Sequence, residues 1–143
     1  MATPMTLREK KFDNLMNKYK AGKEIILMPC AGLVEFIESG DLDGDDLKSY
    51  LKDKFSEFKG QKIGSVVLGC THYPFVREAI QETVGQGVPV IDGGFGTCKE
   101  LKRRLESQNL INNSNKKGNI EIYNSLKEQR MIDISKQLLN KEM

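Results

Sequence analysis

The sequence has few of the residues that mark a specialised protein class. Its 143 residues include no Trp, one His, four Pro and three Cys. Three widely spaced cysteines do not form a disulfide framework, so we expect free thiols and a cytoplasmic protein. No apolar run approaches membrane-spanning length, and the start MATPMTLREKKFD lacks the apolar core of a signal peptide. We therefore expect no membrane partner.

The charge balance excludes a strongly basic or acidic protein. The chain carries 22 Lys and Arg against 20 Asp and Glu, a net charge of +2, which gives no electrostatic case for nucleic acid. Hydrophobic residues make up 38% and charged residues 29% of the chain, as in ordinary globular proteins. The length suits one compact domain or part of a larger two-lobed protein.

Apolar periodicity alternates along the chain between strand-like and helical patterns. Short apolar runs predict strands at residues 24–30, 65–70, 88–92 and 119–123, and helical spacing predicts helices at 7–19, 32–39, 45–60, 73–84, 94–108 and 125–139. Strands that alternate with helices favour an α/β fold with a parallel, doubly wound, flavodoxin-like sheet.

Three polar or nucleophilic residues end predicted strands. Cys30, Cys70 and Asp92 fall at strand carboxyl ends, the edge where open parallel sheets bind ligands. Cys70 also precedes a predicted helix, whose first N–H groups would stabilise a thiolate. His72, the one histidine, could reach that thiol within a turn. The alternative is that Cys70 is a buried core thiol, since free Cys is often buried.

Other patterns point to structure more than to chemistry. Three Cys and one His lack the close pairing of a zinc site, so we expect no metal. Gly93–Gly96 lacks the spacing of known phosphate-binding loops and indicates a tight turn. Cys98 lies at helical spacing from Phe95 and Leu101, which predicts a core position.

The stretch LGCTHYPFVREAI, followed by VPVID, resembles the second catalytic-cysteine segment of bacterial glutamate racemases, members of the aspartate/glutamate racemase superfamily. ATPMTLREKKF, MPCAGLVEFIESG and VIDGG resemble neighbouring segments of that family. The resemblance implies that residues 1–91 form the second of two lobes and that residues 92–143 return to the first. The family's Asp-Ser-Gly turn and its other catalytic cysteine are not in this sequence, which therefore resembles a carboxyl-terminal portion.

The same resemblance implies a cofactor-independent isomerase that interconverts L- and D-glutamate with two thiols, for peptidoglycan synthesis. Cys70 falls on the second catalytic thiol, Thr71 on a substrate-binding residue, His72 on the residue that assists the thiol, and Glu38 on an auxiliary acid. Cys30 does not fall on a catalytic position, so we expect it to pack at a strand end. Glu38 could instead be an exposed helix-end carboxylate.

Two functions stay open from the sequence. The first is the racemase portion, which we expect to be inactive alone and to self-associate through its exposed lobe surface. The second is a non-catalytic flavodoxin-like module derived from a racemase. An aspartate-directed relative is disfavoured, because such relatives often place glutamate where this chain has His72.

Overall fold

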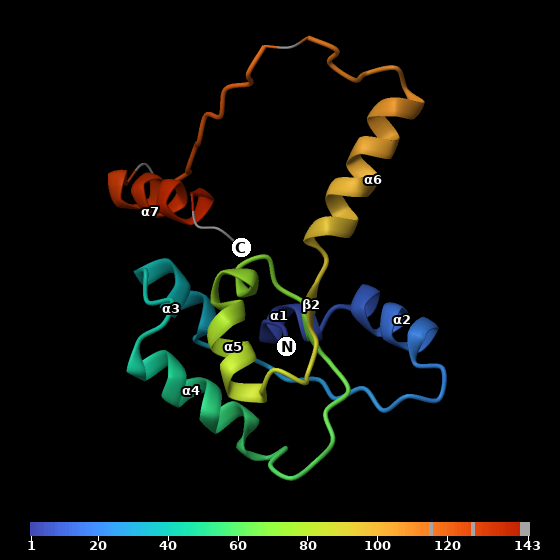
Figure 1. Ribbon diagram of the computed structural model, residues 1–143, viewed down its shortest axis with the longest axis vertical. Coiled ribbons are helices and arrows are strands. Elements are labelled where there is room, and N and C mark those ends of the chain that lie inside the picture. The colour runs from blue at the N-terminus through green and yellow to red at the C-terminus, as the bar shows by residue number, and fades with distance from the viewer. Residues whose placement is uncertain (115, 127, 141–143) are drawn as a thin grey trace. The chain divides into compact units, whose positions relative to one another are not determined.

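The computed structural model of the protein describes residues 1–114, 116–126 and 128–140. The contacts divide the chain into two units, one formed by Met1–Asp92 and one that begins at Gly93. The first unit combines helices with a small parallel sheet, which confirms the predicted α/β class (Figure 1). Within the described ranges, no helix is long and apolar enough to cross a membrane.

The sheet is built from two of the predicted strands. β1 (Val66–Leu68) pairs in parallel with β2 (Val90–Asp92), with Val66 opposite Val90 and Leu68 opposite Asp92. β-Branched residues suit these strands because their side chains pack well on a pleated surface. Val66 and Leu68 are buried whereas Val67 is 57% exposed. The first unit therefore covers only one face of its sheet.

The first two residues extend this sheet beyond β1. The Met1 ammonium donates to the Val67 carbonyl oxygen at 2.9 Å, and the Gly69 N–H donates to the Met1 oxygen at 2.8 Å. Ala2 forms a parallel bridge with Pro29 on its other side. A Cβ at Gly69 would lie 3.1 Å from the Met1 oxygen, so this close approach favours glycine. Met1–Ala2 thus connects β1 to the segment that ends at Cys30.

Two predicted strands are wrong among the described residues. In residues 24–30 the structure has only the bridge at Pro29, and Ile26 and Leu27 are 51% and 43% exposed. Residues 119–123 have no strand. A strand requires a neighbour along its length to bind its backbone groups, and the described residues supply one bridge to the first segment and none to the second. The sheet is consequently smaller than the predicted doubly wound sheet.

Helices form most of the regular structure in the described residues. The elements are α1 (Pro4–Leu7), α2 (Lys10–Tyr19), α3 (Leu33–Ser39), α4 (Asp45–Ser56), a 3₁₀ turn η1 (Tyr73–Val76), α5 (Arg77–Val84), α6 (Gly94–Ser107) and α7 (Gln129–Leu139). The predicted helix at 7–19 corresponds to α2, and residues 4–7 form the separate short helix α1. Thr3 caps α1 by accepting the Thr6 N–H at 3.2 Å. The predicted helix at 73–84 begins as the 3₁₀ turn, with Pro74 near its start.

The core of the first unit lies between its helices. α4 packs against α5 (Figure 1), and α3 packs against η1. The residues in these elements that are at most 1% exposed are Leu33, Ile37, Leu47, Leu51, Tyr73, Val76, Ala79 and Ile80. Large apolar side chains of this kind each contribute about 1.5–3 kcal/mol when fully buried. This cluster fixes α3 and η1 relative to each other.

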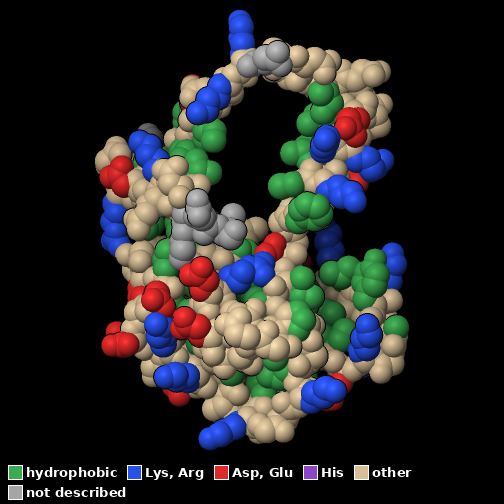
Figure 2. All heavy atoms as spheres, in the orientation of Figure 1, with side chains coloured by type: hydrophobic (Ala, Val, Ile, Leu, Met, Phe, Trp, Pro, Cys, Tyr) green, Lys and Arg blue, Asp and Glu red, His purple; other side chains and the backbone are tan. Residues whose placement is uncertain are grey.

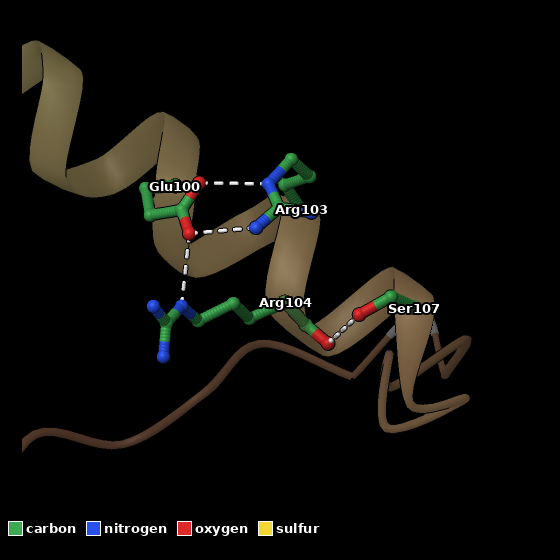
Figure 3. Close-up of polar contacts among 4 residues, drawn as sticks. All are labelled: Glu100, Arg103, Arg104 and Ser107. Atoms are coloured by element: carbon green, nitrogen blue, oxygen red, sulfur yellow. Dashed lines mark hydrogen bonds and ion pairs between the residues drawn. The ribbon is translucent and has the colours of Figure 1, made fainter.

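The second unit has no buried residue among its described positions. Phe95 is 83% exposed and Leu101 is 58% exposed, and hydrophobic side chains are visible as green spheres along α6 in Figure 2. Cys98 is also exposed, so its predicted core position is wrong. Helical spacing correctly identified an apolar side of α6, but the other described residues of the second unit do not bury it. Polar contacts stabilise the helix locally, with Glu100 accepting from Arg103 and Arg104 (Figure 3).

Candidate active site

Cys70 lies where β1 has ended and the chain turns toward η1. It follows Leu68 by two residues, and its side chain is half-buried. The position agrees with the predicted location at a strand carboxyl end. It is also accessible, unlike Cys30, whose exposed fraction is 1%. A half-buried thiol at this edge can meet a ligand and still be held by the fold.

His72 lies between a thiol and a carboxylate. Its Nδ1 atom is 3.9 Å from Cys70 Sγ, and its Nε2 atom is 3.2 Å from Glu38 Oε1. An ionised carboxylate can only accept a hydrogen bond, so Nε2 is the donor in this contact. In a neutral imidazole Nδ1 is then the acceptor, and it faces the Cys70 thiol. The arrangement lets the imidazole take a proton from sulfur while the carboxylate orients it.

Glu38 reaches this site from the last turn of α3. Gly32 and Gly40 bound this helix, both with φ of 89°, in the left-handed region that favours glycine. The Asp41 N–H donates to the Phe36 oxygen and the Gly40 N–H to the Ile37 oxygen, which together end the helix just after Glu38. The Glu38 side chain is 45% exposed. The structure therefore brings together Cys70, His72 and Glu38, three of the four predicted site residues.

The remaining cysteine and threonine take different positions. Thr71 is exposed and turned to solvent between Cys70 and His72. Cys30 is buried as expected, although residues 24–30 form no strand, and its thiol lies 3.5 Å from the Met28 oxygen. Burial, the largest cause, raises the pKa of Cys30 above its usual value. Cys30 is thus a neutral packing residue that does not join the site.

Three side chains that the sequence did not single out hold the turn that leads into α3. Lys54 Nζ donates to the Pro29 oxygen at 3.0 Å, the Tyr73 hydroxyl to the Cys30 oxygen at 3.2 Å, and the Tyr50 hydroxyl to the Ala31 oxygen at 3.0 Å. Three consecutive carbonyl groups are thereby satisfied by side chains from α4 and η1. Only the position of Tyr73 next to His72 could have drawn attention to it in the sequence.

Asp92, the third strand-end residue, has a structural partner. Its carboxylate forms an ion pair with Arg77, which also donates to the Val90 oxygen. These contacts tie the first residue of α5 to β2. Asp92 therefore helps to hold α5 against the sheet and is not part of the Cys70 cluster.

Among the described residues, the Cys70 cluster belongs neither to a metal-binding group nor to the hollow along α6. Among the described residues, no group of three His, Cys, Asp or Glu side chains could hold a metal ion. An open hollow of about 710 Å³ lies along α6, where its lining includes Phe95, Cys98 and Arg103. Residues of one helix supply this lining, and none of Glu38, Cys70, Thr71 or His72 belongs to it. We assign no site to it.

Comparison with known proteins bears on the two functions left open by the sequence. No family model matches the chain. A glutamate racemase of Clostridium botulinum (strain Alaska E43 / Type E3) is 55% identical over 139 residues, which is 97% of this chain and 54% of that protein. A glutamate racemase of Clostridium perfringens (strain ATCC 13124) is 52% identical over the same shares. The close homologues of the 143-residue chain are thus glutamate racemases.

Solved structures of glutamate racemases have the same fold. The Francisella tularensis glutamate racemase, solved in complex with D-glutamate, has a TM-score of 0.81 at 26% identity and covers 98% of this chain and 52% of its own. The Escherichia coli glutamate racemase covers 73% of this chain and 40% of its own, with a TM-score of 0.65 at 25% identity. The chain spans about half the length of the curated relatives it matches, as a carboxyl-terminal portion would. These relatives do not favour the non-catalytic module.

Proposed function

We propose that this chain is the carboxyl-terminal portion of a cofactor-independent glutamate racemase and supplies one of its two catalytic thiols. The support is the match to about half of each curated relative, together with the GCTHYP string at residues 69–74. In this proposal residues 1–91 form the second lobe and residues 92–143 return to the first lobe. The substrates are D- and L-glutamate, and the D-enantiomer serves peptidoglycan synthesis in the cytoplasm.

The observation that carries the proposal is the contact series from Cys70 through His72 to Glu38. Racemisation takes the Cα proton of glutamate from one face and returns a proton to the other face, so it requires a base on each side. His72 is placed to hold the proton of Cys70, which leaves a thiolate that can take the proton from Cα. Glu38 keeps the imidazole in the tautomer that accepts from sulfur. Thr71, exposed beside them, binds the substrate.

The proposal requires a second thiol from another lobe. When the Cys70 thiolate takes the proton on its face, the opposite thiol gives a proton to the other face of the carbanion, and the two sulfurs exchange protonation states. Cys30 is buried and neutral, so it does not fill that role. We therefore expect the 143-residue chain alone to racemise neither enantiomer at an appreciable rate.

A chimera provides the direct test. The matched 139 residues of the clostridial relative are replaced by the corresponding residues of this chain, and the purified chimera is incubated with each enantiomer while optical rotation is followed. We expect racemisation, and we expect Cys70→Ser to remove it, because a hydroxyl is a far weaker acid than a thiol. Cys98→Ala, a change at an exposed thiol outside the site, should leave the rate unchanged.

Two outcomes of this experiment would contradict the proposal. One is a folded chimera that leaves both enantiomers unchanged. The other is a Cys70→Ser chimera that racemises glutamate as fast as the parent chimera. Circular dichroism of each protein verifies that the fold is retained.

A further inference from the structure

The Cys70, His72 and Glu38 side chains come from two segments that are far apart in sequence. Residues 70–72 follow β1, whereas Glu38 lies 34 positions before His72 on α3. The side chains of His72 and Glu38 are 35% and 45% exposed. An ion pair or hydrogen bond that water can reach holds two side chains in one geometry only weakly. The alignment of these groups therefore requires a second connection between the two segments.

Tyr73 makes that connection from the core. It is the residue after His72, its side chain is fully buried, and its hydroxyl donates to the Cys30 oxygen at 3.2 Å. Cys30 lies in the turn that ends at Gly32, where α3 begins. One side chain thus joins the backbone at His72 to the backbone that leads to Glu38. Its ring is fully buried in η1, which packs against α3, and its hydroxyl binds the backbone just before α3.

We propose that Tyr73 is a positioning residue that holds His72 between Cys70 and Glu38 through its hydrogen bond to the turn before α3. The proposal rests on the proposed role of Cys70 and His72 as a proton-transfer pair. The Tyr73 hydroxyl donates to a backbone oxygen, so Tyr73 acts on the site through the position of its neighbour His72. Its loss changes where the imidazole lies, and the imidazole then no longer accepts from the Cys70 thiol.

Tyr50 offers a matched control for this proposal. Its hydroxyl donates to the Ala31 oxygen at 3.0 Å, in the same turn and next to the carbonyl group that Tyr73 binds. Tyr50 belongs to α4, however, whereas Tyr73 is the residue that follows His72 in the chain. Tyr50→Phe and Tyr73→Phe therefore remove the same chemical group from adjacent hydrogen bonds. Only the second substitution releases the residue beside His72.

The first measurement uses the fact that His72 is the one histidine of the chain. In the ¹⁵N-labelled 143-residue protein, its two ring nitrogens give signals that need no further assignment and that distinguish the two neutral tautomers. We expect the parent and Tyr50→Phe to have the Nε2–H tautomer. We expect Tyr73→Phe to shift the signals toward a mixture of both tautomers. Identical imidazole signals in the parent and Tyr73→Phe would overturn the proposal.

The second measurement follows the Cys70 thiol. The chain is alkylated with iodoacetamide from pH 6 to pH 9, and the rates of Cys70 and of exposed Cys98 are separated by peptide mass spectrometry. At pH 7 we expect Tyr73→Phe to slow Cys70 relative to Cys98, toward the rate found with His72→Asn, because the imidazole no longer removes the thiol proton. Tyr50→Phe should keep the parent rate ratio at every pH.

The outcomes separate this proposal from the proposed function. If His72→Asn slows Cys70 and Tyr73→Phe does not, the positioning role of Tyr73 is overturned while the Cys70–His72 pair remains. If His72→Asn leaves Cys70 unchanged, both the pair and the positioning role are overturned.

If Tyr73→Phe fails to fold in the 143-residue chain, both tyrosine variants are compared in the chimera. There Tyr73→Phe should lower kcat about tenfold or more with KM unchanged, and Tyr50→Phe should change neither; a Tyr73→Phe chimera with parent kcat would overturn the proposal.

Discussion

The two units of this chain differ in how far their apolar side chains are buried. In Met1–Asp92, the apolar sides of α3, α4, η1 and α5 meet in a closed cluster, and the site residues lie at its edge. From Gly93 on, no described residue is buried, although α6 and α7 both have an apolar side. Most helical stability in proteins comes from packing such a side. The first unit therefore has its own core, whereas the described residues of the second unit form none among themselves.

The sharpest test of this difference is a pair of leucine truncations. Leu51 in α4 is fully buried and Leu101 in α6 is 58% exposed. Leu51→Ala should lower the free energy of unfolding by about 2–5 kcal/mol, because it leaves a cavity in the core. Leu101→Ala should change it by less than about 0.5 kcal/mol. Urea denaturation followed by near-ultraviolet circular dichroism measures both, and equal losses would refute the contrast between the units.

A second test concerns the uncovered sheet face of the first unit. Val67 and Ile91 lie opposite each other on β1 and β2 and are 57% and 50% exposed. Exposed apolar surface of this kind favours association, so we expect the purified chain to form oligomers at micromolar concentration. Sedimentation velocity over a concentration series should show weaker association for Val67→Thr/Ile91→Thr. A parent chain that stays monomeric throughout would contradict this expectation.

Alkaline pH should destabilise the first unit through its buried turn. Burial is the largest cause that raises the pKa values of Tyr73 and Tyr50 above 10.0 and that of Cys30 above 9.0. A raised pKa in the folded state stabilises the fold fully below the unfolded pKa, and this contribution is lost as pH rises toward the folded pKa. The melting temperature should therefore fall between pH 9 and pH 11. Tyr73→Phe should flatten this decline, and a melting temperature that is constant over the interval would contradict the account.

The smallest effect is expected in α6 at acid pH. Hydrogen bonds from Arg103, and then Arg104, lower the pKa of Glu100 to about 2 (Figure 3). Because this pKa is lower in the folded than in the unfolded state, the ionised carboxylate stabilises the helix at pH values above the unfolded pKa of 4.5. This contribution is lost as pH falls toward about 2. Because the site is exposed, solvent screening keeps the contribution small. The protection factors of the α6 amides, which compare each exchange rate with the intrinsic rate at the same pH, should fall slightly below pH 4, and Glu100→Gln should remove that fall. The same fall in the variant would point to another group.

The sequence predicted those parts of the fold that depend on local patterns. β1 and β2 are short β-branched runs, and α3 begins and ends at glycines. Residues 24–30 are equally apolar but are not a strand, because strand formation depends on neighbours that a local pattern does not specify. The same limit applies to Cys98, since helical spacing identifies a side of α6 but not what covers it.

The candidate site was predictable only in part for a similar reason. Cys70 and His72 are neighbours in the chain, so a turn could bring them together. Glu38 was expected only from the family resemblance, since it lies 34 residues away from His72. Tyr73 and Tyr50 were missed because their partners are backbone carbonyls 43 and 19 residues distant, and a carbonyl has no sequence signature.

The central claim is that Cys70, assisted by His72, serves one face of the glutamate Cα. The most direct measurement is the primary isotope effect on racemisation by the chimera, with Cα-deuterated D- and L-glutamate, before and after His72→Asn. If the claim holds, proton transfer at Cys70 becomes more rate-limiting in the variant. The isotope effect should then rise for the enantiomer that Cys70 deprotonates and fall for the other enantiomer. Equal changes for both enantiomers would contradict the claim and give His72 a general role in binding or structure.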